Sequence, residues 1–83
     1  MIRLGLHHLA VIQGLGQSGS VSATARLLGL TQSAVSHRMK EAERRTGSLL
    51  FSKSGHVIAL TQAGRRLLQS ADAILGEMAL AER

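Results

Sequence analysis

The stretch that decides the fold is ATARLLGLTQSAVSHRMKE, from Ala23 to Glu41. It begins as a short apolar helix pattern, turns at Gly29, and restarts at Thr31 as a basic segment rich in small polar side chains. Two short helices joined by a tight turn, the second of them basic and polar, are the sequence form of a helix-turn-helix. Such a unit presents the start of its second helix to the major groove of DNA.

The boundaries of this unit follow from capping residues. The second helix of the chain is expected to begin near Val21 with Ser22 as its N-cap, because a serine hydroxyl can accept from a free backbone N–H of the first turn. Gly29 sits where that helix must stop and reverse. Thr31 is then expected to cap the third helix, with Leu30 and Val35 at the two positions of a hydrophobic staple.

Helical periodicity continues inside and before the unit. Within the third helix, spacings of four and three place Val35, Met39 and Ala42 on one buried stripe, and Gly47 ends the helix. Before the unit, an apolar residue recurs every third position and predicts a first amphipathic helix that ends near residues 16–19; these residues are Leu6, Leu9, Ile12 and Leu15.

The last third of the chain predicts a hairpin and a long helix. Residues 49–53 and 56–60 are short and compatible with β-strands, and Ser54-Gly55 separates them. Thr61 caps a final helix that runs to the C-terminus. Its apolar positions step alternately by four and three, which is a heptad seam that we expect to pair two copies of the chain; the predicted interface residues are Leu67, Ala71, Ile74, Leu75 and Met78.

Composition narrows the function classes. The 83 residues suffice for one small domain, and the absence of Cys excludes a disulfide framework and a thiolate metal site. No apolar run approaches the length of a membrane span, and no signal pattern appears. The net charge is +5, and residues 20–66 hold eight basic side chains against two acidic ones. This basic centre indicates a surface for a polyanion, although an ordinary solvated surface has a similar composition.

Metal binding and catalysis are not expected. The adjacent His7 and His8 should diverge by about 100° on a helix, and neither His37 nor His56 stands at ligand spacing with them. Serine and histidine are present without an acidic partner or a nucleophile-elbow pattern, so a hydrolase is a remote option. We therefore predict no cofactor and no enzyme activity.

The order of three helices, a hairpin and a long helix is a winged helix-turn-helix followed by a helical arm, a mainly α fold. At this level the chain resembles the N-terminal DNA-binding domain of LysR-type transcriptional regulators. The similarity covers nearly the whole chain, and it is carried by GSVSATARLLGLTQSAVSHRMKEAE, GSLLFSK and LTQAG at their mutual spacing. It implies a winged domain over residues 1–60 and a linker helix for dimerisation over residues 61–83.

Family members look like this domain followed by a larger domain that senses a small metabolite. The chain is accordingly expected to be a fragment that meets an effector only through that missing domain. The similarity further implies a bacterial, cytoplasmic regulator without membrane contact, a homodimer on double-stranded DNA, and a tetramer as an option for the full-length protein. Within the family, TQSAVSH is similar to the corresponding run of the methionine-biosynthesis regulators.

Four residues at the start of the third helix are the candidates for reading base edges, because Gln can pair with adenine and Ser can donate or accept. They are Gln32, Ser33, Ser36 and His37. Ser33 replaces a proline, and His37 an arginine, that are usual in the family. Ser20 and Ser22, at the start of the second helix, could present N–H and hydroxyl groups to a phosphate, and Thr31 is a further candidate DNA-binding residue. The candidate basic phosphate contacts are Arg38, Lys40, Lys53, Arg65 and Arg66. Weaker candidates, which could face away from DNA, are Arg44, Arg45 and Arg65.

Two other readings remain open. A molybdate-responsive regulator carries a similar winged helix, although the short wing and the QSAVS run fit it less well. A helical module that only dimerises through its last helix belongs to a different class, and it would not bind duplex DNA at all.

Overall fold

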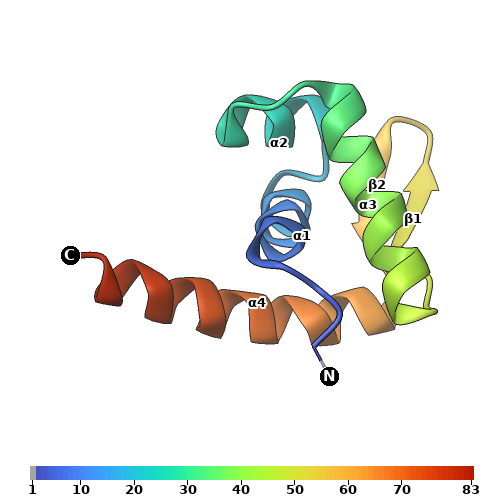
Figure 1. The fold of residues 1–83 in the computed structure, drawn as a ribbon. Helices are drawn as coiled ribbons and strands as arrows, with labels where there is room; N and C mark the ends of the chain where they lie inside the picture. Colours follow the sequence, from blue (N-terminus) through green and yellow to red (C-terminus); the bar gives the residue numbers. More distant parts are fainter. Residues whose placement is uncertain (1) are drawn as a thin grey trace.

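The computed structural model describes residues 2–83, and Figure 1 shows its helices arranged around a central one. The helices are α1 (Leu6–Ser18), α2 (Val21–Leu28), α3 (Gln32–Thr46) and α4 (Gln62–Ala81), and the strands β1 (Phe51–Ser54) and β2 (Val57–Leu60) lie between α3 and α4. In this view α1 is seen nearly end-on, with α2 above it, α3 beside it and α4 below it. The predicted winged helix-turn-helix with a long final helix is confirmed.

The helix-turn-helix forms as its caps predict. Gly29 ends α2 in the left-handed conformation, with φ of 67°, which glycine adopts without steric cost. The N–H of Leu30 then reaches back to the carbonyl of Ala25 at 2.8 Å. Two residues after Gly29, the hydroxyl of Thr31 accepts from the N–H of Ala34 at 3.0 Å and starts α3. The chain direction therefore changes within three residues.

The cap of α2 differs from the prediction. Its N-cap is Ser20, whose hydroxyl accepts from the N–H of Ala23 at 3.1 Å. Ser22 lies inside the first turn, and its hydroxyl is 3.0 Å from that of Ser20. Because Val21 is already helical, only the residue before it has the extended backbone that lets a side chain reach a free N–H of the first turn.

The core lies where α1 meets the other elements. Val11 and Leu15 of α1 form one buried cluster with Val35 of α3 and Ile58 of β2. Ile12, which is fully buried, joins a second cluster with partners from α3 and the segment before β1, namely Ala42 and Leu50. Apolar side chains buried to this degree contribute about 1.5–3 kcal/mol each.

Leu6 is not part of this core, although the three-residue spacing predicted that it would be. Its exposed fraction is 46%. A strict three-residue step drifts by about 60° per repeat around an α-helix, so the start of such a stripe turns away from the surface that its end covers. The buried residues in the first turn of α1 are His8 and Leu9.

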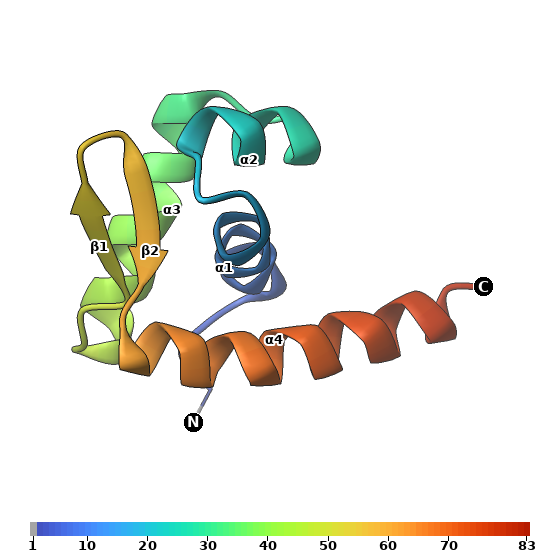
Figure 2. The same cartoon turned by 180° about the vertical axis from the view of Figure 1, so that it is seen from behind.

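The wing is a two-stranded antiparallel hairpin that lies against α3 (Figure 2). Phe51 pairs with Leu60 and Ser54 with Val57, so the turn is Gly55-His56, one residue later than predicted, and the strands are shorter. The N–H of Ile58 donates to the carbonyl of Gly19 at 2.9 Å. This hydrogen bond fastens β2 to the end of α1.

α4 begins at the wing and crosses under α1. The hydroxyl of Thr61 accepts from the N–H of Gly64 at 3.1 Å and donates to the carbonyl of Leu49 at 2.6 Å, so one side chain both caps α4 and holds the segment before β1. A Cβ at Gly64 would lie 2.2 Å from the carbonyl oxygen of Leu50. Glycine is required there because backbone approaches backbone.

The two halves of α4 have different surroundings. The first half packs on α1, and the second half extends beyond the other elements in both views (Figures 1 and 2). Leu67 packs against the Ile12 cluster, and Ala71 is fully buried within the chain. The expectation that Ala71 contacts a second chain is therefore corrected, because it has no exposed surface. Ile74 and Met78 remain 43% and 38% exposed. No helix within residues 2–83 is long and apolar enough to span a membrane.

Candidate nucleic-acid interface

The exposed face of α3 carries small polar and basic side chains. Val35 and Ala42 bury the opposite face. Residues that follow one another at steps of three and four share one face of a helix. On α3 such a series faces away from the buried stripe, and its members are Ser33, Ser36, His37, Lys40 and Arg44. Glu41, four residues after His37 and three before Arg44, borders this series.

Three elements surround a hollow of about 300 Å³ at the start of α3. Gln32 comes from α3, and Ser20 and Ser22 come from the start of α2. Lys53 and His56 come from the wing. The hollow thus joins free backbone N–H groups, hydroxyls and a lysine, all of which suit a phosphate oxygen. The sequence pointed to both serines as candidate phosphate contacts but not to His56, because the proximity of His56 depends on how the wing packs.

A second hollow of about 310 Å³ separates α3 from the wing. Ser36 and Lys40 of α3 line one side, and Lys53 of β1 lines the other. Lys53 therefore borders both hollows and lies between the predicted base-reading residues and the tip of the hairpin. The structure brings the predicted residues Gln32, Ser36, Lys40 and Lys53 together on one side of the domain.

Two arginines of α3 are placed differently from the prediction. Arg38 is half-buried, about 100° around the helix from His37 and off the exposed face. Its charge acts instead on His7 of α1. Arg44, a weaker candidate for DNA contact from the sequence, shares the exposed face, and its side chain is 67% exposed. Thr31 stays exposed while its hydroxyl caps α3.

Glu43 joins α3 to the wing. Its carboxylate oxygen Oε2 accepts from the N–H of Leu50 at 2.9 Å and from the N–H of Phe51 at 3.2 Å. These N–H groups belong to the residue just before β1 and to the first residue of β1. Since the wing has only two strands, this contact from α3 helps to set its position beside the recognition face. No sequence pattern pointed to this contact.

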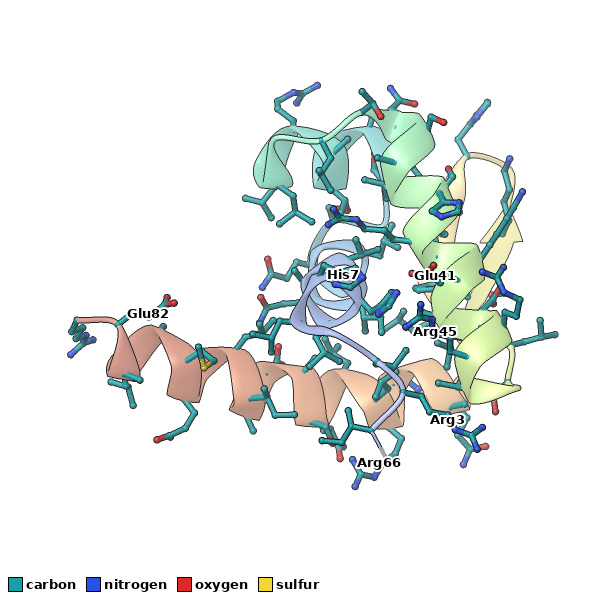
Figure 3. The ribbon with its side chains drawn as sticks, in the orientation of Figure 1. Arg3, His7, Glu41, Arg45, Arg66 and Glu82 are labelled. Atoms are coloured by element: carbon teal, nitrogen blue, oxygen red, sulfur yellow. The ribbon has the colours of Figure 1, made fainter. Side chains whose placement is uncertain are left out.

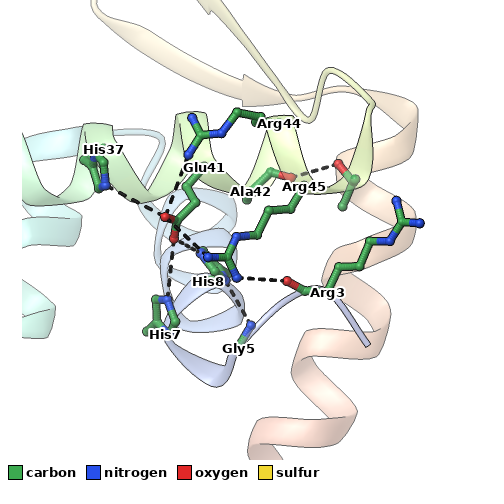
Figure 4. Close-up of polar contacts among 10 residues, drawn as sticks. Arg3, Gly5, His7, His8, His37, Glu41, Ala42, Arg44 and Arg45 are labelled. Carbon is green, nitrogen blue, oxygen red and sulfur yellow. Dashed lines mark hydrogen bonds and ion pairs between the residues drawn. The ribbon is translucent and has the colours of Figure 1, made fainter. Parts of the chain in front are cut away.

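A polar cluster links α1 to the other side of α3 (Figure 4). His8 is fully buried; its Nδ1 accepts from the N–H of Gly5 at 2.9 Å, and its Nε2 lies 2.5 Å from Oε1 of Glu41. Because Nδ1 accepts, Nε2 carries the proton and donates to the carboxylate. His7 and Glu41 also point toward one another between the two helices (Figure 3).

This cluster has the spacing of a metal site without its chemistry. The ring centroids of His7 and His8 are 3.9 Å apart, so the expected divergence of the two rings is wrong. The ligand atoms of His7, His8 and Glu41 all lie within 4.8 Å of one another. However, Nε2 of His8 bears a proton and Nδ1 is occupied by Gly5, which leaves no lone pair for a cation. Arg44 and Arg45 lie 3.8 and 3.7 Å from the same carboxylate and would repel one.

The surroundings shift two pKa values. The hydrogen bond from His8, together with the charge of Arg45, holds the pKa of Glu41 below its ordinary value of 4.5, although burial acts in the opposite direction. Glu41 is therefore a carboxylate at neutral pH. Burial lowers the pKa of His7 below 6.5, and the neighbouring His8 and Arg38 act in the same direction.

Residues 6–65 match the model of the family described as bacterial regulatory helix-turn-helix protein, lysR family. The chain belongs to the LysR family. The predicted LysR-type regulator domain, with its winged helix-turn-helix, is thereby confirmed.

Relatives within the LysR family are transcriptional regulators. The chain is 38% identical over 80 residues to the HTH-type transcriptional regulator MetR of Haemophilus influenzae. The matched region covers 96% of the chain and 26% of MetR. It is 41% identical over 86 residues to the regulator CbbR of Rhodospirillum rubrum, covering 100% of the chain and 29% of CbbR. The chain thus spans little more than a quarter of the length of these relatives.

Solved structures of LysR-family proteins share the fold. The complex of the CbnR DNA-binding domain with DNA superposes with a TM-score of 0.87 at 25% identity, over 95% of this chain and 91% of that one. Full-length LysG of Corynebacterium glutamicum, solved with bound effector Arg, superposes with a TM-score of 0.87 at 26% identity, over 95% of this chain and 27% of LysG.

Proposed function

We propose that the chain binds specific sequences of duplex DNA as the DNA-binding domain of a LysR-type transcription regulator. In this proposal α3 enters the major groove and the wing contacts the flanking backbone. The observation that carries it is the exposed face of α3, where small polar and basic side chains follow one another from Ser33 to Arg44, with the acid Glu41 at its border. The similarity to a domain solved with DNA, over 95% of the chain, supports it.

The base-reading residues are those nearest the start of α3. Gln32 can make a paired contact to adenine, and Ser33 and Ser36 can donate or accept. Their short side chains let the helix approach the base edges closely. His37 is 72% exposed on the same face and completes the set.

The phosphate-binding residues surround that set. Lys40 and Lys53 line the hollow between α3 and the wing, and Lys53 also lines the hollow at the start of α3 with Ser22 and Ser20. Hydroxyls and free N–H groups at a helix start bind phosphate oxygens and position a protein without reading sequence. Thr31, exposed at the cap of α3, is a secondary member, whereas Arg38 lies off the exposed face.

The exposed second half of α4 is proposed to pair two copies of the chain. Leu75 is half-buried beside the exposed Ile74 and Met78, so an apolar surface is left where α4 extends beyond α1. A two-fold dimer would place two α3 helices on an inverted repeat. Tetramers and a small-molecule effector belong to the longer protein that the relatives represent. We further propose that this protein acts in the bacterial cytoplasm and catalyses no reaction.

Selection of bound sites from random duplex DNA tests the proposed function. We expect a short motif to be enriched, and two inverted copies of it to be enriched when the domain is concentrated enough to pair. A variant with both Gln32→Ala and Ser36→Ala serves as the matched control and should enrich a different or less defined motif. A helical module that only dimerises would enrich nothing, and that result would overturn the proposal.

A further inference from the structure

Glu41 is an acidic residue placed at the border of a basic surface. Its carboxylate lies beside the exposed face of α3, between His37 one turn before it and Arg44 one turn after it (Figure 4). The side chain is 19% exposed. The other acid of α3, Glu43, is turned to the wing and accepts from backbone N–H groups there. Glu41 is thus the acid of α3 that faces its cationic side chains.

His8 holds this carboxylate in one orientation. The imidazole is fully buried, its Nδ1 is held by the N–H of Gly5, and its Nε2–H donates to Oε1 of Glu41. An ordinary exposed carboxylate must lose side-chain freedom to form an ion pair, which is one reason why surface pairs are weak. Glu41 has already lost that freedom through its hydrogen bond with His8, so its second oxygen is held in a fixed position toward the neighbouring cations.

That second oxygen faces two arginines. Oε2 lies 3.8 Å from Nη2 of Arg44 and 3.7 Å from Nη2 of Arg45. Arg45 is held from the other side as well, because its Nη1 donates to the carbonyl of Arg3 at 3.3 Å. Arg44 has no such second partner among the hydrogen bonds of residues 2–83, and it lies on the face that is proposed to meet DNA.

We propose that Glu41 retains Arg44 and thereby limits the number of phosphates that α3 can neutralise, which keeps sequence-independent DNA affinity low. This inference rests on the proposed function. Each neutralised phosphate makes the logarithm of the binding constant fall by about 0.9 per logarithmic unit of salt. An arginine engaged by a fixed carboxylate does not add such a contact. Stable binding then depends on base contacts and on the second half-site.

The test is a set of variants whose affinity for a random-sequence duplex is measured as a function of salt concentration. Glu41→Gln keeps an oxygen that can accept from His8 but removes the charge. We expect tighter binding at low salt and a slope steeper by about 0.9 per bound subunit. Glu82→Gln, at the exposed C-terminal end of α4, is the matched control for net charge and should leave the slope unchanged.

Arg44→Gln identifies the released cation. In the native background this change should leave the slope nearly unchanged, whereas in the Glu41→Gln background it should remove the added slope. Arg44 is an exposed surface residue, so this arm remains informative even if Glu41→Gln unfolds the domain. Circular dichroism of each variant identifies such unfolding.

The outcomes separate the inference from the proposed function. If the native domain binds no duplex, the proposed function fails. If it binds duplex but Glu41→Gln gives the same slope as Glu82→Gln, or Arg44→Gln lowers the native slope by a full contact, then Glu41 does not retain Arg44 and the inference is overturned.

Discussion

The carboxylate of Glu43 lies 2.9 Å from the backbone nitrogen of Leu50, and this contact joins the recognition helix to the wing. The same oxygen accepts from the N–H of Phe51, the first residue of β1. The two surfaces proposed to touch DNA are therefore connected by one side chain. Its removal should affect both stability and binding.

Glu43→Ala is expected to destabilise the domain by about 1–3 kcal/mol, because it leaves the N–H groups of Leu50 and Phe51 without their acceptor. Thermal or urea unfolding measures this loss. Glu43→Gln retains an acceptor oxygen and should lose less. Equal stability of the alanine variant and the native domain would show that the contact does not stabilise the fold.

Substitutions on α3 and on the wing should have different effects on sequence preference. Gln32→Ala and Ser36→Ala remove base contacts and should each cost about 1–3 kcal/mol on the selected site alone. Lys53→Ala removes a phosphate contact and should weaken all duplexes alike. Affinities for selected and scrambled duplexes measure the difference. A change of preferred bases in the Lys53 variant would mean that the wing reads sequence.

The second half of α4 should control pairing. Ile74→Asp introduces a charge into the exposed apolar surface and is expected to yield monomers with much poorer binding to an inverted repeat. Gln69→Asp introduces the same charge about 140° around α4 from Ile74, at an exposed position, and should leave pairing intact. Sedimentation distinguishes the two. An unchanged species distribution in the Ile74 variant would reject this surface as the dimer interface.

Acid should weaken the domain through two groups. The folded-state pKa values of Glu41 and His7 both lie below their ordinary values of 4.5 and 6.5, so the unfolded chain binds more protons as pH falls. The stability associated with His7 therefore decreases below about pH 6.5, and that associated with Glu41 decreases below about pH 4.5. The free energy of unfolding, measured across pH, should decline less below pH 4.5 in Glu41→Gln than in the native domain. An identical decline would mean that the Glu41 pKa is not depressed.

Local patterns predicted the helix-turn-helix well because its determinants lie close together in sequence. Thr31, Gly29 and Gly47 act within a few residues of their partners, and all three were predicted correctly. The α2 cap was misplaced by two positions, from Ser20 to Ser22, because both serines suit the role and only the backbone distinguishes them.

The polar links of the site could not be predicted in the same way. His8 and Glu41, which contact each other, are 33 residues apart in the sequence, and Glu43 contacts the backbone of Leu50 seven residues away. No rule of sequence spacing pairs a histidine on an apolar helix with a glutamate on a basic one, or a second glutamate with a distant backbone segment. Only the packing of α1 and the wing on α3 creates the contacts.

The proposed function requires that α3 meet DNA through its exposed face. The most direct measurement is the change of backbone amide NMR shifts when the domain is titrated with a duplex recovered by selection. We predict that the largest changes fall on Gln32, Ser33, Ser36 and Lys40, with further changes at Lys53, and that those of buried Ala42 are small. Changes concentrated on α4, with α3 unaffected, would contradict it.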